Sequence, residues 1–232
     1  MASKTLRTPL GRTIRPAPSR PAKRLLDSLV ALVLLILLSP LMFLIAILIK
    51  LTSRGPVFYR DERLGRGGRV FRMFKFRTMK VNAPPRLTAD GKLVVTRNDP
   101  RLTTIGRPLR ALHLDEVPQL LNVLAGQMSF VGPRAGQPKY ESTYSDTAYE
   151  RLRVHPGITG LAAVLGGRHL TNECLYELEA RYVRRQDLWL DFLIFMMTPT
   201  YVLFGPKVPR AILRRCTEGI KFHSVAEGDD ET

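Results

Sequence analysis

One long apolar run stands out from the hydrophobic pattern of the chain. The run from Leu25 to Ile49 is rich in Leu, Ile and Val and is interrupted only by Asp27, Ser28 and the pair Ser39-Pro40. At about 1.5 Å rise per residue, a straight helix of this length reaches roughly 36 Å, enough to cross a bilayer core of about 30 Å. The run is too long for a cleaved signal peptide, and no small-residue cleavage site follows it. The pattern therefore predicts a membrane helix.

Two features favour a helix that dips into one leaflet and returns over a helix that crosses. Positive charge flanks the run on both sides, in residues 20–24 and 50–60, whereas a spanning helix usually has its excess on one side. Pro40 removes a helical hydrogen bond, and the Ser39 hydroxyl can satisfy the freed carbonyl. The two halves, about 20 Å and 14 Å long, are each too short to cross alone. We expect a re-entrant helix broken at Ser39-Pro40, with a kinked single span as the alternative.

Shorter patterns predict the other elements. In residues 74–77 two aromatic residues alternate with Lys75 and Arg77, as in a half-buried strand, so the two cations could hold a phosphate together or could line a solvated edge. Residues 175–185 predict an amphipathic helix with Glu and Arg on its outer face. Residues 188–204 are more apolar and suit either the lipid interface or a buried core. The predicted fold class is α+β and mostly helical, with interfacial helices and a few short strands.

Charge and composition divide the chain further. The formal net charge of +16 indicates anionic partners, which could be nucleic acid, lipid headgroups or phosphorylated small molecules. Residues 1–22 hold no acidic residue and four prolines, a composition that buries too little apolar surface to fold. We expect a disordered basic arm over residues 1–22, the re-entrant helix over 23–50, a cytoplasmic catalytic domain with interfacial helices over 51–206 and a C-terminal tail over 207–232.

An acidic pair is the leading candidate for chemistry. Asp115 and Glu116 stand just ahead of Pro118, and an apolar run with helical spacing follows until Gly126. Proline is favoured in a first helical turn and glycine just past a last one, so a helix is predicted to begin near Asp115. Free N–H groups and the positive dipole end would keep the carboxylate ionised and attract phosphate. An ordinary N-cap aspartate is the alternative.

Two glycine-containing segments predict tight loops. Residues 131–136 include Gly132, Pro133 and an exposed Arg134, and could offer backbone donors and a fork-shaped cation to a diphosphate. Residues 155–160 form a second loop of similar character, followed by Arg168. Each could equally be only a turn. The four histidines and two cysteines show no metal-ligand spacing.

Taken together, these residues resemble the bacterial sugar transferases, the monotopic phosphoglycosyl transferases that start glycan assembly on polyprenyl phosphate. The resemblance covers about residues 23 to 204. It is carried by Lys23-Arg24-Leu25-Leu26-Asp27, Ser39-Pro40, Gly55-Pro56-Val57-Phe58, Phe74-Lys75-Phe76-Arg77-Thr78-Met79, Leu114-Asp115-Glu116, Pro118-Gln119-Leu120-Leu121-Asn122-Val123-Leu124, Met128-Ser129-Phe130-Val131-Gly132-Pro133-Arg134 and Pro156-Gly157-Ile158-Thr159-Gly160.

The resemblance implies a two-step transfer from a UDP-sugar donor to a polyprenyl phosphate acceptor. Asp115 would attack the sugar-linked phosphate and form a covalent phosphosugar intermediate, which the acceptor would then attack. Asp115 and Glu116 would lie near a Mg²⁺ ion. The family pattern makes Arg110 a phosphate ligand. Further candidates for phosphate or substrate binding are Lys75, Arg77, Gly132, Pro133, Arg134 and Arg168.

The resemblance also implies a location and a set of partners. Both flanks of the re-entrant helix would lie in the cytoplasm, and the enzyme would be a monotopic protein of the bacterial inner membrane, in contact with membrane lipids and not with nucleic acid. A homodimer is compatible with this prediction. The competing hypothesis is a membrane-anchored protein that binds anionic lipid or nucleic acid without turnover.

The chain departs from the family pattern at four positions. Ala135 stands where a proline usually follows Gly-Pro-Arg, and Leu161, Ala163 and Leu165 replace a tryptophan, a glutamine and an asparagine. These departures leave the acidic pair untouched but put the identity of the donor sugar in question.

Overall fold

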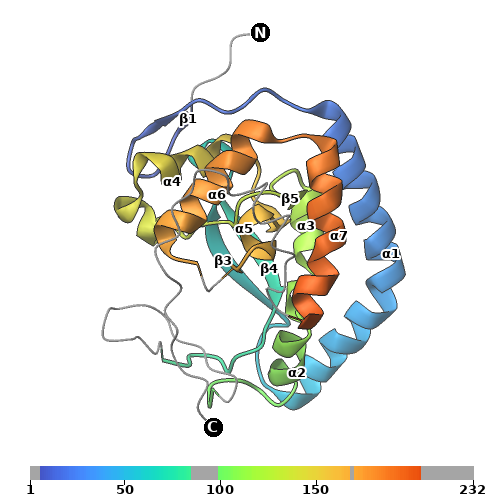
Figure 1. The fold of residues 1–232 in the computed structure, drawn as a ribbon. Helices are drawn as coiled ribbons and strands as arrows, with labels where there is room; N and C mark the ends of the chain where they lie inside the picture. The colour runs from blue at the N-terminus through green and yellow to red at the C-terminus, as the bar shows by residue number, and fades with distance from the viewer. Residues whose placement is uncertain (1–5, 85–98, 168–169, 205–232) are drawn as a thin grey trace. The chain divides into compact units, whose positions relative to one another are not determined.

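The computed structural model describes residues 6–84, 99–167 and 170–204 (Figure 1). The predicted C-terminal tail over 207–232 and the candidate Arg168 lie outside these residues. The described parts of residues 1–24, 62–71 and 127–232 form one compact unit, the first unit, and those of residues 25–61 and 72–126 form a second unit. The prediction of a mostly helical α+β fold with short strands is confirmed.

The predicted membrane helix is present as α1 (Pro21–Thr52), a single helix that contains Pro40. Because Pro40 has no N–H, the carbonyl of Ile36 loses its helical partner, and the Ser39 hydroxyl donates a hydrogen bond to that carbonyl at 2.8 Å. Figure 1 shows that the axis of α1 bends along its length, as expected for a helix with an internal proline. The expected role of the serine is therefore confirmed, while re-entry into the membrane stays a prediction.

Most of the apolar surface of α1 is exposed. Only 11% of its most apolar 18-residue window is buried. In its C-terminal half, Ile45 and Ile49 are buried against Phe76 and Leu109 in the core of the second unit. The large side chains left exposed on α1 are Leu25, Leu26, Leu29, Leu32, Val33, Ile36, Leu37, Phe43, Leu44, Ile47 and Leu51. An apolar surface of this size is typical of contact with lipid or another protein, and not of the core helix of a soluble domain.

A hairpin of β3 (Phe58–Leu64) and β4 (Val70–Phe76) runs through both units. In the second unit, Phe58 stacks on Phe76 at 5.5 Å between ring centroids and meets Phe74 edge to face at 6.3 Å. Phe74 and Phe76 therefore both contact Phe58, in agreement with the prediction that the two aromatic side chains point the same way. Beside the hairpin lie α2 (Gly106–Ala111), the single turn η2 (Leu114–Glu116) and α3 (Gln119–Leu124).

Asn122 joins α3 to β4 within the second unit. This side chain is fully buried, and its Oδ1 accepts a hydrogen bond from the Phe74 N–H at 2.9 Å. Its Nδ2 donates to the carbonyl of Arg72 at 2.8 Å. Two backbone groups of the strand are thus satisfied by one amide side chain, which fixes α3 against the residues that precede Lys75.

The first unit is built around a short parallel pair and the C-terminal helices. Strand β5 (Ser129–Val131) pairs with β6 (Gly157–Thr159), with Ser129 opposite Gly157 and Val131 opposite Thr159. Helix α7 (Leu188–Phe204) contacts both strands, and α5 (Leu161–Val164) contacts α7 and α6 (Asn172–Arg185). The remaining elements of this unit are η1 (Arg66–Gly68), η3 (Pro138–Thr143), α4 (Asp146–Glu150) and η4 (Arg151–Arg153).

The described part of the N-terminal arm is ordered, which corrects the prediction of disorder over residues 1–22. Strands β1 (Leu6–Arg7) and β2 (Thr13–Ile14) pair antiparallel. Ile14 is buried with Leu64 and Leu152, and the Arg12 guanidinium lies 4.3 Å from the ring centroid of Tyr149. Apolar packing, a cation–π contact and backbone hydrogen bonds such as that from the Ala17 N–H to the Arg153 carbonyl at 2.8 Å thus attach the arm, although its composition is polar.

Candidate active site

Asp115 lies in the one-turn element η2, two residues after His113, whose backbone is left-handed with φ 55°. The N-cap of η2 is His113, and the N-cap of α3 is Pro118, so Asp115 caps neither element. A 3₁₀ turn does begin near Asp115, but the α-helix predicted to begin there starts only at Gln119, and the alternative of an N-cap aspartate is wrong. The reason is local: Pro118 fixes the start of α3, and the preceding residues close a separate 3₁₀ turn.

The acidic pair and Lys75 come together in the second unit. Lys75 Nζ lies 2.5 Å from Glu116 Oε1, in an ion pair that is mostly shielded from solvent. Asp115, in contrast, is 6% exposed and accepts no hydrogen bond within the described part of the chain. Glu116 therefore binds the lysine, while the neighbouring carboxylate is left for another partner.

Burial is the main cause that raises the pKa of Asp115, and the negative charge of Glu116 adds to it. Lys75, Arg110 and His113 act in the opposite direction and favour the ionised carboxylate. A carboxylate held at the balance of these effects is more basic than a solvated aspartate, and therefore more nucleophilic once ionised.

Arg110 stands out on α2, five residues before Asp115. Its Nη1 is buried and finds no hydrogen-bond partner among the described residues. A buried donor without a partner is costly in a folded protein, so its presence beside a carboxylate points to an anionic ligand that would accept the hydrogen bond. This observation supports the predicted role of Arg110 as a phosphate ligand.

Arg77 occupies a different position from Lys75. It follows the last residue of β4, is buried, and donates from Nη2 to the carbonyl of Ser53 at 2.9 Å. Its Nη1 donates to the carbonyl of Arg54. Arg77 thus satisfies carbonyls that follow the end of α1, which favours a structural role over the predicted binding of phosphate.

A pocket of about 520 Å³ lies in the second unit, near the end of α1. Asp115 is not among its walls, which are Thr52, Ser53, Lys80, Pro100, Leu102, Thr103, Thr104, Arg107 and Pro108. Two cations and four hydroxyl groups make this pocket more suitable for an anion than for an apolar ligand. Helix α2 therefore places Arg107 at the pocket and Arg110 close enough to act on the pKa of Asp115.

In the first unit, residues 131–136 form the tight loop that the sequence predicted. Gly132 and Pro133 are buried, and Arg134 is the one exposed residue of the six. The Gly132 N–H donates to the carbonyl of Thr159 at 2.9 Å. A Cβ added at Gly157 would lie only 2.2 Å from the Gly132 nitrogen, so this approach requires glycine. The two glycine-containing segments, predicted as separate loops, are in fact paired.

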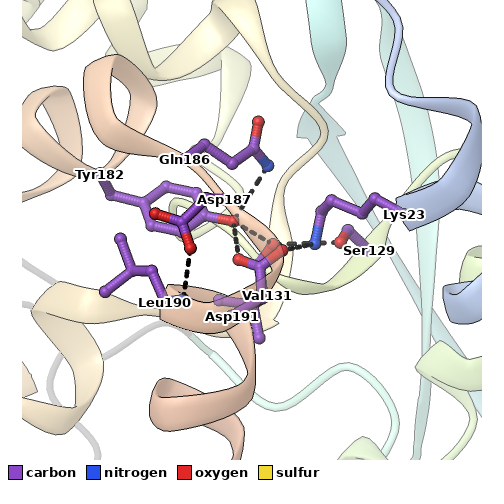
Figure 2. A network of polar contacts seen from close by, with 8 residues as sticks. All are labelled: Lys23, Ser129, Val131, Tyr182, Gln186, Asp187, Leu190 and Asp191. Atoms are coloured by element: carbon purple, nitrogen blue, oxygen red, sulfur yellow. Dashed lines mark hydrogen bonds and ion pairs between the residues drawn. The ribbon is translucent and has the colours of Figure 1, made fainter.

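A buried polar network joins the start of α1 to α7 within the first unit (Figure 2). Lys23 Nζ lies 2.7 Å from Asp191 Oδ2. The Tyr182 hydroxyl lies 2.6 Å from the other oxygen of Asp191 and 2.9 Å from the carbonyl oxygen of Val131. The side chain of Gln186 donates to the same hydroxyl at 3.0 Å. Asp191 lies inside the continuous helix α7.

Sequence reasoning missed two charged residues around the 131–136 loop, Glu179 and Arg151. Glu179 was assigned to an outer face of its helix but is 3% exposed. Leu178 and Tyr182, on the same face of α6, are also buried. Burial raises the pKa of Glu179, while the charge of Arg151 lowers it.

Three of the four departures from the family pattern are buried. Ala135, Leu161 and Leu165 are 5%, 7% and 6% exposed, and Ala163 is partly buried. Leu161 opens α5 after Gly160. These side chains serve the core of the first unit, so none of the three presents a surface to a ligand.

A family model described as bacterial sugar transferase matches residues 18–205. Over 192 residues the chain is 43% identical to the UDP-glucose:undecaprenyl-phosphate glucose-1-phosphate transferase of Xanthomonas campestris pv. campestris, which covers 78% of this chain and 39% of that protein.

Two further relatives differ in length and in name. The exopolysaccharide production protein ExoY of Rhizobium meliloti (strain 1021) is 39% identical over 188 residues, or 76% of this chain and 83% of that protein. The UDP-N-acetylgalactosamine-undecaprenyl-phosphate N-acetylgalactosaminephosphotransferase of Aeromonas hydrophila is 38% identical over 189 residues, or 79% of this chain and 44% of that protein. The chain thus spans about two fifths of the length of several of these relatives.

Proposed function

Because the chain belongs to the bacterial sugar transferase family, we propose that it transfers a sugar-1-phosphate group from a UDP-sugar to polyprenyl phosphate. The buried Asp115 carboxylate carries the proposal, since its pKa is raised by burial while Lys75 and Arg110 favour its ionised form. The names of relatives that use UDP-glucose or UDP-N-acetylgalactosamine support a UDP-sugar donor and a lipid phosphate acceptor.

The reaction proceeds in two displacements at phosphorus. A carboxylate oxygen of Asp115 attacks the phosphorus atom that is linked to the sugar, and the bond to the UMP oxygen breaks, so UMP leaves with the electron pair. A phosphate oxygen of the polyprenyl acceptor then attacks the same phosphorus atom, and the bond to Asp115 breaks. Two steps at one nucleophile allow a soluble donor and a lipid acceptor to use the site in turn.

Lys75, Glu116 and Arg110 support these steps in different ways. The ion pair with Glu116 holds the Lys75 ammonium beside the nucleophile. Among the described residues, the buried Nη1 of Arg110 has no hydrogen-bond partner, so it can donate to a phosphate oxygen. Fixed positive charge stabilises a phosphoryl group more effectively in a shielded site than it would in water.

Mg²⁺ is the proposed cofactor, and Asp115 or Glu116 would hold it. No group of three His, Cys, Asp or Glu side chains is assembled among the described residues. Two adjacent carboxylates still fit this metal, because Mg²⁺ is commonly bound through one or two carboxylates plus substrate phosphates and water. The ion would neutralise the diphosphate charge that opposes attack by a carboxylate.

The proposed location is the cytoplasmic face of the bacterial inner membrane. The exposed apolar surface of α1 and the support that Ser39 gives to Ile36 favour a monotopic, re-entrant helix. On α7 the exposed aromatic pair Trp189 and Phe192, with ring centroids 5.6 Å apart, suits the lipid interface. A catalytic domain held at the membrane surface by α1 and α7 would reach both a soluble donor and a lipid acceptor.

The test is UMP release and mass measurement with the purified full chain, Mg²⁺ and a panel of UDP-sugars that begins with UDP-glucose. With the acceptor withheld, the intact protein should gain the mass of a phosphosugar. Asp115→Asn should abolish both the adduct and turnover, and Glu116→Gln should reduce turnover severely. Asp146→Asn, at an exposed position, is the matched control. Full turnover by Asp115→Asn would refute the covalent scheme, and the absence of UMP release from every donor would refute the proposed function.

A further inference from the structure

The loop from Val131 to Gly136 is fixed through its backbone along its length. Donors from three different segments of the first unit reach its carbonyl groups. These contacts are Tyr182 hydroxyl to Val131 at 2.9 Å, Gly157 N–H to Pro133 at 2.9 Å, Arg63 Nη1 to Ala135 at 2.8 Å and Leu64 N–H to Gly136 at 2.8 Å. A loop with so many satisfied carbonyls has little freedom to change its backbone conformation.

The peptide groups of Arg134 receive the most unusual contacts. Glu179 Oε1 accepts a hydrogen bond from the Arg134 N–H at 2.8 Å, and Arg151 Nη2 donates to the Arg134 carbonyl at 2.7 Å. Arg151 Nη2 also lies 2.9 Å from Glu179 Oε2. One ion pair therefore binds both backbone groups of a single residue whose own side chain is exposed.

This ion pair is almost fully buried, with Arg151 7% and Glu179 3% exposed. The Arg151 guanidinium also packs near Tyr144 and Tyr176, at 5.6 Å and 5.1 Å from their ring centroids. A buried ion pair is rarely more stabilising than apolar residues of the same volume, because both charges lose their hydration. Its hydrogen bonds to the N–H and the carbonyl of Arg134 instead fix the backbone position of that residue.

Helix α6 holds the loop at two points. Glu179 and Tyr182 lie three residues apart, on the same face of this helix, and bind Arg134 and Val131 respectively. Tyr182 is in turn held by Gln186 and Asp191 (Figure 2). The direction in which the Arg134 side chain leaves the loop is therefore set by a network and not by one contact.

We infer that Glu179 and Arg151 are positioning residues that fix the Arg134 guanidinium for binding a phosphate group of the UDP-sugar, an inference that rests on the proposed function. Guanidinium binds phosphate through two parallel hydrogen bonds, so its orientation matters more than that of a lysine. A cation that is oriented before the ligand arrives loses less conformational entropy on binding.

The experiment measures the affinity of the purified full chain for UDP in the presence of Mg²⁺. Arg134→Ala should weaken UDP binding by roughly 10- to 100-fold, as expected for the loss of charge-assisted hydrogen bonds. Glu179→Gln should weaken it by roughly 3- to 30-fold. In the combined variant, Glu179→Gln should add less than about twofold to the effect of Arg134→Ala, because it acts through that side chain.

Two further variants separate positioning from folding. Glu179→Gln combined with Arg151→Met leaves no unpaired buried charge, so it should fold and still show weak UDP binding. Glu177→Gln is the matched control, since Glu177 lies on α6 and pairs with Arg181 at 3.5 Å near the surface; its affinity should equal that of the wild type.

Three results would overturn the inference. They are wild-type affinity in Arg134→Ala, an effect of Glu179→Gln that is equally large with and without Arg134, and absence of UDP binding by the wild type. Turnover is not needed for this measurement. Arg134-dependent UDP binding without UMP release from any donor would therefore leave the positioning inference intact and refute the proposed function.

Discussion

The ionisation of Asp115 is set by neighbours that act in opposite directions. Burial and Glu116 raise the pKa of this carboxyl, and Lys75, Arg110 and His113 lower it. In the proposed mechanism only the ionised form attacks phosphorus, so turnover should rise with pH through the pKa of Asp115. The pH at which turnover falls on the acid side therefore depends on the charges of these neighbours.

Removing single neighbours should move that acid side in predictable directions. In Lys75→Met the pKa of Asp115 should rise, since a charge that lowers it is lost, and the acid limb of kcat should move to higher pH. In Glu116→Gln the pKa should fall, and the limb should move to lower pH. The measurement is kcat for UMP release across about pH 5 to 9. Lys139→Met, at an exposed position, should leave the profile in place; shifts with the opposite signs would contradict this account.

At the level of residues, the sequence singled out candidate side chains but predicted little of their geometry, and their chemical roles stay predictions. The acidic pair, Lys75 and the exposed Arg134 were all recognised, because their residue types and spacing are local features. The setting of Asp115 was mistaken, since a proline three residues later fits a helix that starts at either position. The burial of Glu179 depends on tertiary packing. The local sequence gives little indication of it, because Glu179 is a charged residue on an amphipathic helix.

At the level of elements, α1 follows from local rules. The proline removes one N–H, the serine before it satisfies the Ile36 carbonyl, and both effects could be read from two adjacent letters of the sequence. The pairing of β5 with β6 could not, because parallel strands that are distant in sequence share no turn. Gly132 and Gly157 identified the two segments in the sequence, but they did not show that the segments pair.

Replacing Pro40 should change the topology of α1. Pro40→Leu restores the N–H that the Ile36 carbonyl lacks, so the helix should straighten and cross the bilayer. Single cysteines introduced before residue 21 and after residue 52 should both react with cytoplasmic reagents in the otherwise wild-type protein. In the Pro40→Leu background they should react from opposite sides. Ser39→Ala, which keeps the proline, is the control; opposite-side labelling without any substitution at Pro40 would establish a span.

At the level of the whole molecule, residues far apart in sequence build the first unit. The N-terminal arm contributes Ile14 to a cluster with Leu64 and Leu152, and Lys23 reaches Asp191 across 168 positions. Neither contact could be predicted, because a single sequence carries no record of which distant charge is the partner. The order of the described part of the arm was missed for the same reason.

Breaking the Lys23–Asp191 pair should destabilise the protein strongly. Both side chains are about 10% exposed, so Lys23→Met leaves a buried carboxylate without its cation and should cost about 3–5 kcal/mol of unfolding free energy. The combined change Lys23→Met with Asp191→Leu should recover most of this loss. Urea unfolding in detergent provides the measurement. A loss of less than about 1 kcal/mol in Lys23→Met, the range of a surface ion pair, would contradict the importance of this contact.

The Asn122 amide has a consequence for how copies of this protein behave at high concentration. A two-stranded hairpin leaves unpaired backbone groups along its outer edges, and such edges can recruit a strand from another chain and start aggregation. By bonding the Phe74 N–H and the Arg72 carbonyl, the side chain of Asn122 occupies the place that an incoming strand would take. The amide therefore blocks this part of the hairpin edge to pairing with a strand of another chain.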